Sequence, residues 1–263
     1  MGKQAFKTRG MPNWVDCATT DLATAEEFYA AVFGWTAERV KASDGSVYSL
    51  QRLDGKMVAG LYELSDELRG MGVPPHWGTY FEVDDVDSVL KAAAGAGGRV
   101  VEDPIEEPGV GKIGIIQDNV GAFARIWTSA PEHGGEVFNV AGALIWNELC
   151  TREPAKAAEF YEKVLGLTAE TMQIPNPYIL LKANARVVAG VLQITAEMGE
   201  MPPSWDVYFG AEDVDATTAA ARAAGGTVLR EPFDIAGGQA RMAVLQDPTG
   251  AVFELMSLEL ANM

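Results

Sequence analysis

The sequence has few cysteines, few basic residues and no long apolar run, and each shortage excludes a class of protein. Its two cysteines, Cys17 and Cys150, form no disulfide framework and favour a cytoplasmic location. No apolar run approaches the roughly 18 residues that span a bilayer, and the basic start lacks the apolar segment of a signal peptide. Because phosphate neutralisation requires clustered cations, 20 Lys and Arg against 37 Asp and Glu predict neither a nucleic-acid nor a membrane partner.

The excess of acidic residues gives a formal net charge of -17 at pH 7. Such a charge favours solubility, and it can also attract cationic ligands. Hydrophobic residues make up 48% of the chain and charged residues 22%, which is typical of a globular protein. The sequence contains no phosphate-binding glycine loop before a helix and no G-x-S-x-G nucleophile motif. Nucleotide-binding and serine-hydrolase functions are therefore not indicated.

The most informative feature that is present is an internal repeat. Three segments of a first copy recur in a second. The matching pairs are residues 14–35 with 146–167, 74–87 with 202–215, and 117–123 with 246–252. Two copies of a unit of about 130 residues therefore compose the chain. We predict a first half at 1–130, a linker at 131–142 and a second half at 143–263.

Each half divides again into two modules with one order of elements. In the first module, residues 12–19 alternate as a strand does, and Asp21 can cap a helix that ends at Gly34. Three short strands follow, and the same order begins again near residue 76. The four βαβββ modules are expected at about 12–64, 76–128, 143–195 and 203–257. This order of elements predicts an α+β fold.

These motifs resemble those of the vicinal oxygen chelate superfamily, which includes glyoxalase I, bleomycin- and fosfomycin-resistance proteins and extradiol dioxygenases. The resemblance covers nearly the whole chain. It is carried by DLATAEEFYAAVFG (21–34), EPAKAAEFYEKVLG (153–166), VDDVDSVLKAAAGAGG (83–98) and EDVDATTAAARAAGG (212–226), with QD-x-x-G turns. The W-x-[DE] and PP-x-W segments are similar to a tandem glyoxalase-like subfamily of actinobacterial type. The resemblance implies two glyoxalase-like halves whose curled mixed sheets form open cups that hold the ligand.

The resemblance also implies which residues of this chain correspond to the metal ligands of metal-using relatives. They fall on Trp14 and Trp146, Gly78 and Asp206, Arg125 and Glu254, and near Glu63 and Gln193. Only Glu254 is a conventional ligand. His133 lies in the predicted linker, and His76 lies two residues from a ligand position, so we expect it at the rim. We therefore expect no cofactor, and no iron chemistry of the dioxygenase type.

Strand alternation predicts which side chains share each cup face. The first strands contribute Trp14, Asp16, Ala18, Trp146, Glu148 and Cys150, and the partner strands His76, Gly78, Tyr80, Ser204, Asp206 and Tyr208. Aromatic rings stack on flat ligands, and carboxylates beside them suit a cationic amine. We predict ligand binding by Trp14, Trp146, Tyr80, Tyr208, His76 and Arg125. The alternative is that both tryptophans only fill the space of a lost metal site.

The carboxylates leave two further options. Asp16, Glu148, Asp206 and Glu254 are the catalytic candidates, because crowded carboxylates can supply a general acid or base. If the first module pairs with the fourth, Asp16, Glu63, Asp206 and Glu254 could instead hold Mg, Ca or Mn. Arg125 and Glu254 occupy matched positions with opposite charge, so the two cups are expected to differ. Arg125 could orient a carboxylate or hydroxyl of a ligand.

Three classes of function remain open, and the fold alone does not choose among them. We favour a protein that binds a small organic ligand, planar or aromatic and, as one option, cationic. It would act in drug sequestration or as an accessory or tailoring protein of secondary metabolism. The alternative is a lyase, isomerase or hydroxylase-like enzyme that uses carboxylates with or without a divalent metal. The third class is a purely structural or regulatory interaction protein. A monomer or a homodimer is expected.

Overall fold

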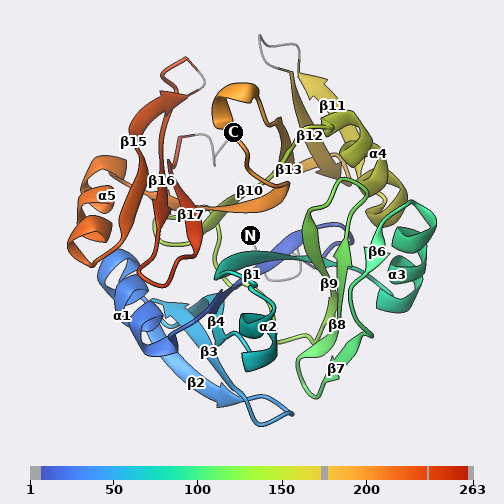
Figure 1. Cartoon of the computed structure of the whole chain (residues 1–263), viewed down its shortest axis with the longest axis horizontal. Helices are drawn as coiled ribbons and strands as arrows, with labels where there is room; N and C mark the ends of the chain where they lie inside the picture. The colour runs from blue at the N-terminus through green and yellow to red at the C-terminus, as the bar shows by residue number, and fades with distance from the viewer. Residues whose placement is uncertain (1–6, 173–176, 236, 260–263) are drawn as a thin grey trace. The chain divides into compact units, whose positions relative to one another are not determined.

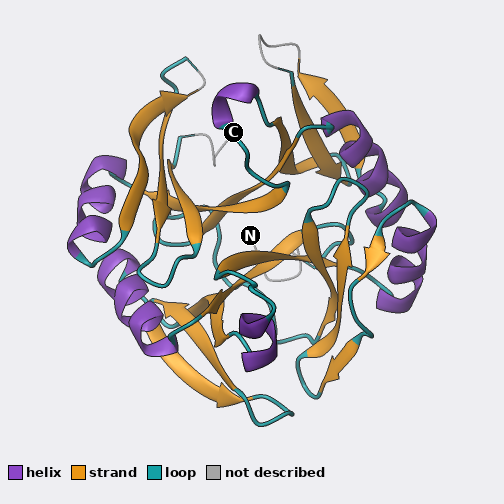
Figure 2. Cartoon of the chain, in the orientation of Figure 1, coloured by secondary structure: helices purple, strands orange, loops and turns teal. Residues whose placement is uncertain are grey.

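The computed structural model describes residues 7–172, 177–235 and 237–259. In this part of the chain, the strands form one nine-stranded and one eight-stranded mixed sheet, and the helices are few (Figure 2). The α+β class and the four βαβββ modules are confirmed (Figure 1). No helix among the described residues is long and apolar enough to cross a bilayer.

Modules 1 and 2 occupy the first half of the chain. Module 1 consists of β1 (Pro12–Thr19), α1 (Leu22–Phe33), β2 (Thr36–Lys41), β3 (Val47–Leu53) and β4 (Lys56–Glu63). A short helix, α2 (Asp66–Gly70), follows it. Module 2 consists of β5 (His76–Glu82), α3 (Val86–Gly95), β6 (Arg99–Val100), β7 (Ile105–Glu107), β8 (Gly111–Gln117) and β9 (Phe123–Ser129). The sequence did not predict α2, and the strand expected near 99–103 is shorter, with β7 as a separate strand.

Modules 3 and 4 repeat this order in the second half. Module 3 consists of β10 (Leu144–Thr151), α4 (Pro154–Leu165), β11 (Thr168–Met172), β12 (Tyr178–Ala183) and β13 (Arg186–Gln193). Module 4 consists of β14 (Ser204–Ala211), α5 (Val214–Ala223), β15 (Thr227–Ile235), β16 (Ala240–Gln246) and β17 (Val252–Ser257). In each module the first strand pairs in parallel with the last, and the other strands continue antiparallel.

Local signals set the helix ends as the sequence predicts. The Asp21 side chain accepts a hydrogen bond from the Thr24 backbone N–H, which satisfies a donor that helix geometry leaves free. Asp85 and Asp213 cap α3 and α5 in the same way. Gly34 ends α1 in the left-handed conformation, where glycine has no steric penalty.

Two compact units each combine two modules from different halves. Unit 1 comprises Met1–Trp14, Gly78–Gly134 and Asn147–Asp206, and unit 2 comprises Val15–Trp77, Gly135–Trp146 and Val207–Met263. In unit 1, α3 lies beside α4, and in unit 2, α1 lies beside α5 (Figure 1). The compact units therefore cross the repeat of the sequence. The division into a first half at 1–130, a linker at 131–142 and a second half at 143–263 stays a prediction.

The predicted linker is partly docked onto unit 2. From Gly135 onward it belongs to that unit. The Trp35 indole N–H donates to the Gly142 carbonyl oxygen at 2.7 Å, and the Met57 backbone N–H donates to Glu136 at 2.8 Å. These contacts order the second part of the segment.

A buried hydrogen-bond chain in unit 2 connects three segments that the sequence repeats. The Trp77 indole N–H donates to the Tyr29 hydroxyl at 2.9 Å, and that hydroxyl donates to Asp247 at 3.0 Å. The other oxygen of Asp247 accepts the backbone N–H groups of the following turn, from Thr249, Gly250 and Ala251. The FY, PP-x-W and QD-x-x-G segments therefore meet at one carboxylate.

Unit 1 contains the same chain of hydrogen bonds. Trp205 donates to the Tyr161 hydroxyl at 2.7 Å, and Tyr161 donates to Asp118 at 3.0 Å. Burial raises the pKa of Tyr161 well above its usual value, and the charge of Asp118 adds to the shift. Burial also raises the pKa of Tyr29, with smaller contributions from Cys17 and Asp247. Both phenols therefore stay neutral at physiological pH and keep the proton that they donate.

We predict that Tyr29→Phe and Tyr161→Phe each lower the free energy of unfolding by about 1–3 kcal/mol, because each leaves a buried indole N–H and a buried carboxylate oxygen without that partner. Urea unfolding followed by circular dichroism would measure the change. Phe123→Leu, at an exposed ring, is the control and should change the value by less than about 0.5 kcal/mol. Equal unfolding midpoints for all three variants would contradict the structural role of this chain.

Candidate functional site

The strand register places the predicted site residues on the sheet faces that point away from the cores. In unit 2, Phe253 and Leu255 belong to the core, so Glu254 between them lies on the opposite face. In unit 1, Phe81 and Ile126 belong to the core, and their neighbours Tyr80 and Arg125 lie on the opposite face. We call these the open faces because they point away from the two large cores, although Tyr80, Arg125 and Glu254 on them are buried.

The open face of module 2, in unit 1, contains a buried guanidinium. Arg125 lies opposite Tyr80 in the strand register, and its side chain is 7% exposed. The guanidinium carbon lies 5.4 Å from the centre of the Tyr80 ring, which in turn packs edge-on against Trp127 at 5.2 Å. A Cβ atom at Gly78 would lie 1.2 Å from the Arg125 Nη1 atom. The missing side chain of Gly78 therefore makes room for the guanidinium.

The open face of module 4, in unit 2, carries a carboxylate at the matched position. Glu254 lies opposite Tyr208 on one side and Val244 on the other. It is 5% exposed. Tyr208 belongs to a hydrophobic cluster with Met242 and Met256, against which Trp146 also packs. The same position therefore holds opposite charges in the two units.

Modules 1 and 3 share a different arrangement of a tyrosine, a glycine and a carboxylate. In unit 2, the Tyr48 hydroxyl donates to Asp16 at 3.4 Å. In unit 1, the Tyr178 hydroxyl donates to Glu148. Each ring crosses a glycine of the neighbouring strand, and a Cβ atom there would lie within 2 Å of the phenol oxygen, at 1.9 Å for Gly60 and 1.8 Å for Gly190. The glycines thus allow each phenol to reach its carboxylate.

Asp206 lies beside a thiol and a hydroxyl in unit 1. The Ser204 hydroxyl donates to it at 2.7 Å, and it is also hydrogen-bonded with the Cys150 thiol. Burial raises the pKa of Asp206, and the two hydrogen bonds lower it by less. The residue as a whole is partly exposed.

The structure separates the two predicted tryptophans by burial. Trp14 is 5% exposed, which fits the alternative that it fills space. Trp146 is partly exposed and borders the cluster that contains Tyr208. His76 is the first residue of β5, is partly exposed, and its Nδ1 atom lies 2.9 Å from the Pro74 carbonyl oxygen. The rim position of His76 stays a prediction.

The open faces do not fit a transition metal. At the Gly78 position, where relatives place a ligand, the guanidinium of Arg125 occupies the space that a side chain would need. A positive charge there opposes the binding of a metal cation. No group of three His, Cys, Asp or Glu side chains that could hold a metal ion occurs among the described residues.

The strand register also argues against the four-carboxylate alternative. Glu63 pairs with Thr19, three residues from Asp16 along β1, so the two acidic side chains point to opposite faces. Glu63 instead accepts a hydrogen bond from the Leu22 backbone N–H at 3.2 Å and lies 3.6 Å from Arg69. Glu63 therefore does not share a face of the sheet with Asp16.

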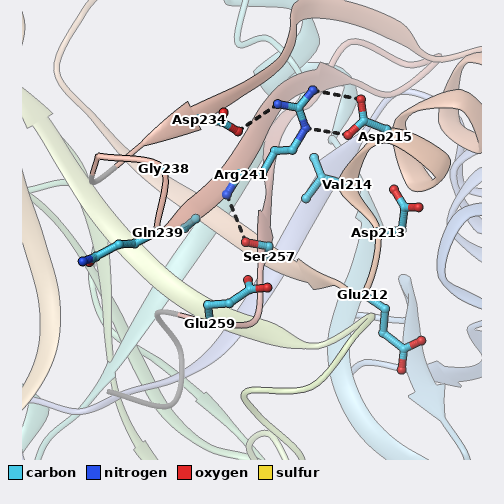
Figure 3. A pocket seen from close by; sticks show the side chains of 11 residues that line it. Glu212, Asp213, Val214, Asp215, Asp234, Gly238, Gln239, Arg241, Ser257 and Glu259 are labelled. Atoms are coloured by element: carbon cyan, nitrogen blue, oxygen red, sulfur yellow. Dashed lines mark hydrogen bonds and ion pairs between the residues drawn. The ribbon is translucent and has the colours of Figure 1, made fainter.

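A surface hollow of about 280 Å³ lies elsewhere on unit 2 (Figure 3). Its lining is acidic, and Arg241 points between Asp215 and Asp234. Arg241 lies 2.5 Å from the Asp215 carboxylate and 2.9 Å from that of Asp234. These hydrogen bonds raise the pKa of Arg241. Exposed ion pairs of this kind contribute little stability, and nothing in the hollow indicates a ligand.

Comparison with known protein families identifies the family to which the chain belongs. A family model described as "Glyoxalase/Bleomycin resistance protein/Dioxygenase superfamily" matches residues 12–124, and one described as "Glyoxalase-like domain" matches residues 147–256. The chain is 40% identical over 259 residues to "Putative glyoxylase CFP32" of Mycobacterium tuberculosis, covering 97% of this chain and 98% of that protein. This chain therefore belongs to the vicinal oxygen chelate superfamily, with two glyoxalase-like domains in tandem.

Other relatives extend the comparison. The chain is 34% identical to "Anthracycline biosynthesis protein DnrV" of Streptomyces peucetius, over 95% of this chain and 94% of that protein. A Mn(II)-bound glyoxalase from Novosphingobium aromaticivorans is similar in structure, with a TM-score of 0.63, 17% identity, and coverage of 96% and 83% of the two chains. A trihydroxybiphenyl dioxygenase from Sphingomonas wittichii gives a TM-score of 0.64 at 16% identity, over 95% and 91%. At these identities the solved structures show the fold alone.

We predict that Asp206→Asn stabilises the protein at pH 7. A carboxyl whose pKa is raised by folding contributes stability below its unfolded pKa, and this contribution is lost as the pH rises through the folded pKa. Replacing it removes the cost of holding the charged form, so the gain should shrink as the pH falls toward about 4. Thermal melts across this pH range would measure it.

The matched control for Asp206→Asn is Asp44→Asn. Hydrogen bonds from Ser46 lower the pKa of Asp44, so this exposed variant should lose stability at pH 7 rather than gain it. If Asp206→Asn melts below the unmodified protein at pH 7, burial does not govern this carboxyl, and its proposed proton chemistry loses support.

Proposed function

We propose that this chain binds a small, largely planar aromatic molecule on its open sheet faces, without a transition metal. The observation that supports this most is the matched placement of a tyrosine beside a buried charge. Tyr80 lies beside Arg125 in unit 1, and Tyr208 lies beside Glu254 in unit 2. A ring next to a fixed charge can hold a flat molecule and orient its polar group.

We place this binding in secondary metabolism, as drug sequestration or as an accessory or tailoring step. The relatives named for anthracycline biosynthesis, from Streptomyces peucetius and Streptomyces sp. strain C5, support that setting because they match nearly the whole chain. The proposal includes a small organic ligand as the only partner, a cytoplasmic location, and a monomer or homodimer. Arg125 would orient a carboxylate or hydroxyl of the ligand.

The second candidate function is catalysis by carboxylates of unit 1. Glu148 accepts a hydrogen bond from the Tyr178 hydroxyl, and burial raises the pKa of Asp206 beside the Cys150 thiol. Such groups can exchange protons with a bound molecule, as an isomerase or lyase requires. An enzyme would lose turnover in Glu148→Gln or Asp206→Asn, whereas a binding protein should keep its ligand affinity in both variants.

We predict that 2-naphthol, a flat neutral probe, binds saturably and changes the tryptophan fluorescence. Trp146→Ala should weaken this binding several-fold, about 1 kcal/mol, because a partly exposed ring that stacks on the ligand is lost. Trp14→Ala should instead lower the free energy of unfolding by about 3–5 kcal/mol, because it leaves a cavity at a buried site. Calorimetric titrations and urea unfolding would separate the two effects.

The matched tryptophans serve as controls for each other in this experiment. If Trp146→Ala loses stability as strongly as Trp14→Ala and keeps its affinity for 2-naphthol, then both rings are packing residues. In that case the open face beside Trp146 is not a binding wall.

A further inference from the structure

The segment before β1 pairs with the end of β5 in unit 1, and we call its residues 7–11 the strap. The Gly10 backbone N–H donates to the Glu82 carbonyl oxygen at 2.8 Å, and the Glu82 backbone N–H donates to the Met11 carbonyl oxygen at 2.9 Å. Met11 is 6% exposed and belongs to the core of the unit. The strap is therefore docked through its backbone and one core side chain.

Unit 2 contains the same backbone arrangement. The Gly142 N–H donates to the Gly210 carbonyl oxygen at 2.8 Å, and the Gly210 N–H donates to the Ala143 carbonyl oxygen at 3.0 Å. These residues occupy the places that the strap and Glu82 occupy in the first copy of the repeat. The second segment therefore provides a reference for the behaviour of the strap.

A lysine at the start of the strap distinguishes it from this counterpart. The Lys7 ammonium donates to the Ser129 hydroxyl at 2.8 Å and to the Ala130 carbonyl oxygen. The Ser129 hydroxyl donates in turn to the Glu82 carboxylate at 2.6 Å, and Glu82 is 6% exposed. A buried carboxylate is costly unless hydrogen bonds or positive charge compensate it, so these contacts stabilise the docked strap. The residue at the place of Lys7 in the second copy is Asn139, which carries no charge.

His133 closes the turn to which Lys7 binds. Its backbone N–H donates at 2.9 Å to the Ala130 carbonyl oxygen, which also accepts the hydrogen bond from Lys7. The Nδ1 atom of the His133 ring is buried and has no hydrogen-bond partner within residues 7–172, 177–235 and 237–259. A neutral imidazole leaves one nitrogen as an acceptor, whereas the protonated ring carries a donor on both nitrogens. Protonation would therefore bury a donor without an acceptor, which costs free energy.

The charged groups around His133 add to this cost. Burial lowers the pKa of His133 most, the positive charge of Lys7 lowers it further, and the negative charge of Glu132 raises it by less. Asn13 and Trp127, which lie next to the following glycine, are neutral. A histidine whose pKa is lowered by docking stabilises the docked strap above pH about 6.5, and this contribution is lost as the pH falls through the lowered pKa.

We propose that the strap is a pH-sensitive element of unit 1, which is docked when His133 is neutral and is released when His133 is protonated. The protonated ring and the Lys7 ammonium repel each other. The contacts of Lys7 then weaken, and the backbone pairing of Gly10 with Glu82 opens. This inference is independent of the proposed function.

Amide hydrogen exchange of the full chain, followed residue by residue by NMR, tests the proposal. When the pH is lowered from about 7.5 to about 5, the protection factors of Gly10 and Glu82, which correct for the intrinsic effect of pH, should fall at least about threefold. Those of Gly142 and Gly210, which make the same hydrogen bonds in unit 2, should change by less than about 1.5-fold. The His133 ring signals should titrate with a midpoint below pH about 6.5.

His133→Gln keeps a polar side chain that does not titrate, so the protection factor of Gly10 should be equal at both pH values. His76→Gln changes the other histidine of the chain and is the matched control, which should retain the loss of protection. Melting temperatures would confirm that both variants are folded.

Three results of the exchange experiment would each overturn this inference: an unchanged protection factor of Gly10 at the lower pH, an equal loss at Gly142, or a loss that persists in His133→Gln. A titration midpoint of the His133 ring at or above pH about 6.5 would overturn it without any variant.

Discussion

The buried carboxylates of Asp118 and Asp247 are the interaction on which the rest of the structure depends. Each accepts the backbone N–H groups of its own turn with one oxygen and a tyrosine hydroxyl with the other. Each tyrosine also accepts an indole N–H, so a helix, a strand start and a turn meet at one point. Because every member is buried, the chain of hydrogen bonds must be complete for the unit to be stable. These contacts fix the core side of the sheets, and Arg125 and Glu254 lie on the opposite faces.

The difference between the core side and the opposite side of each sheet explains how one repeated module supplies different side-chain chemistry. Residues of the cores repeat closely, since packing and the hydrogen-bond chain constrain them, whereas the open faces carry Arg125 in one unit and Glu254 in the other. Gly78 accompanies Arg125 in the first half, because only a residue without Cβ leaves room for the guanidinium. The position that corresponds to Gly78 in the second half is Asp206. The transition-metal chemistry of the superfamily does not fit these residues, because the guanidinium of Arg125 occupies the space at Gly78.

Much of the fold could be predicted from the sequence, but less of the site. Capping aspartates, stop glycines and strand alternation are local signals, and they predicted the order of elements in the modules, although not α2 or the separate strand β7. The pairing of Trp77 with Tyr29 and Asp247 was not predictable from them, because it joins residues that are far apart in the chain. Tyr48 and Tyr178 were also missed as partners of the carboxylates. Comparing the two copies strand by strand would have found them, since Tyr48 with Gly60 and Tyr178 with Gly190 recur at one spacing.

The central claim is that the open faces bind an aromatic molecule without help from a metal. The most direct test combines elemental analysis of the purified chain with titration of 2-naphthol before and after exhaustive chelation. The account predicts metal well below about one transition-metal ion per chain, since the ligand positions lack the required donors, and the same affinity before and after chelation. About one Fe, Mn, Ni or Zn per chain, together with binding that chelation abolishes and the metal restores, would contradict it.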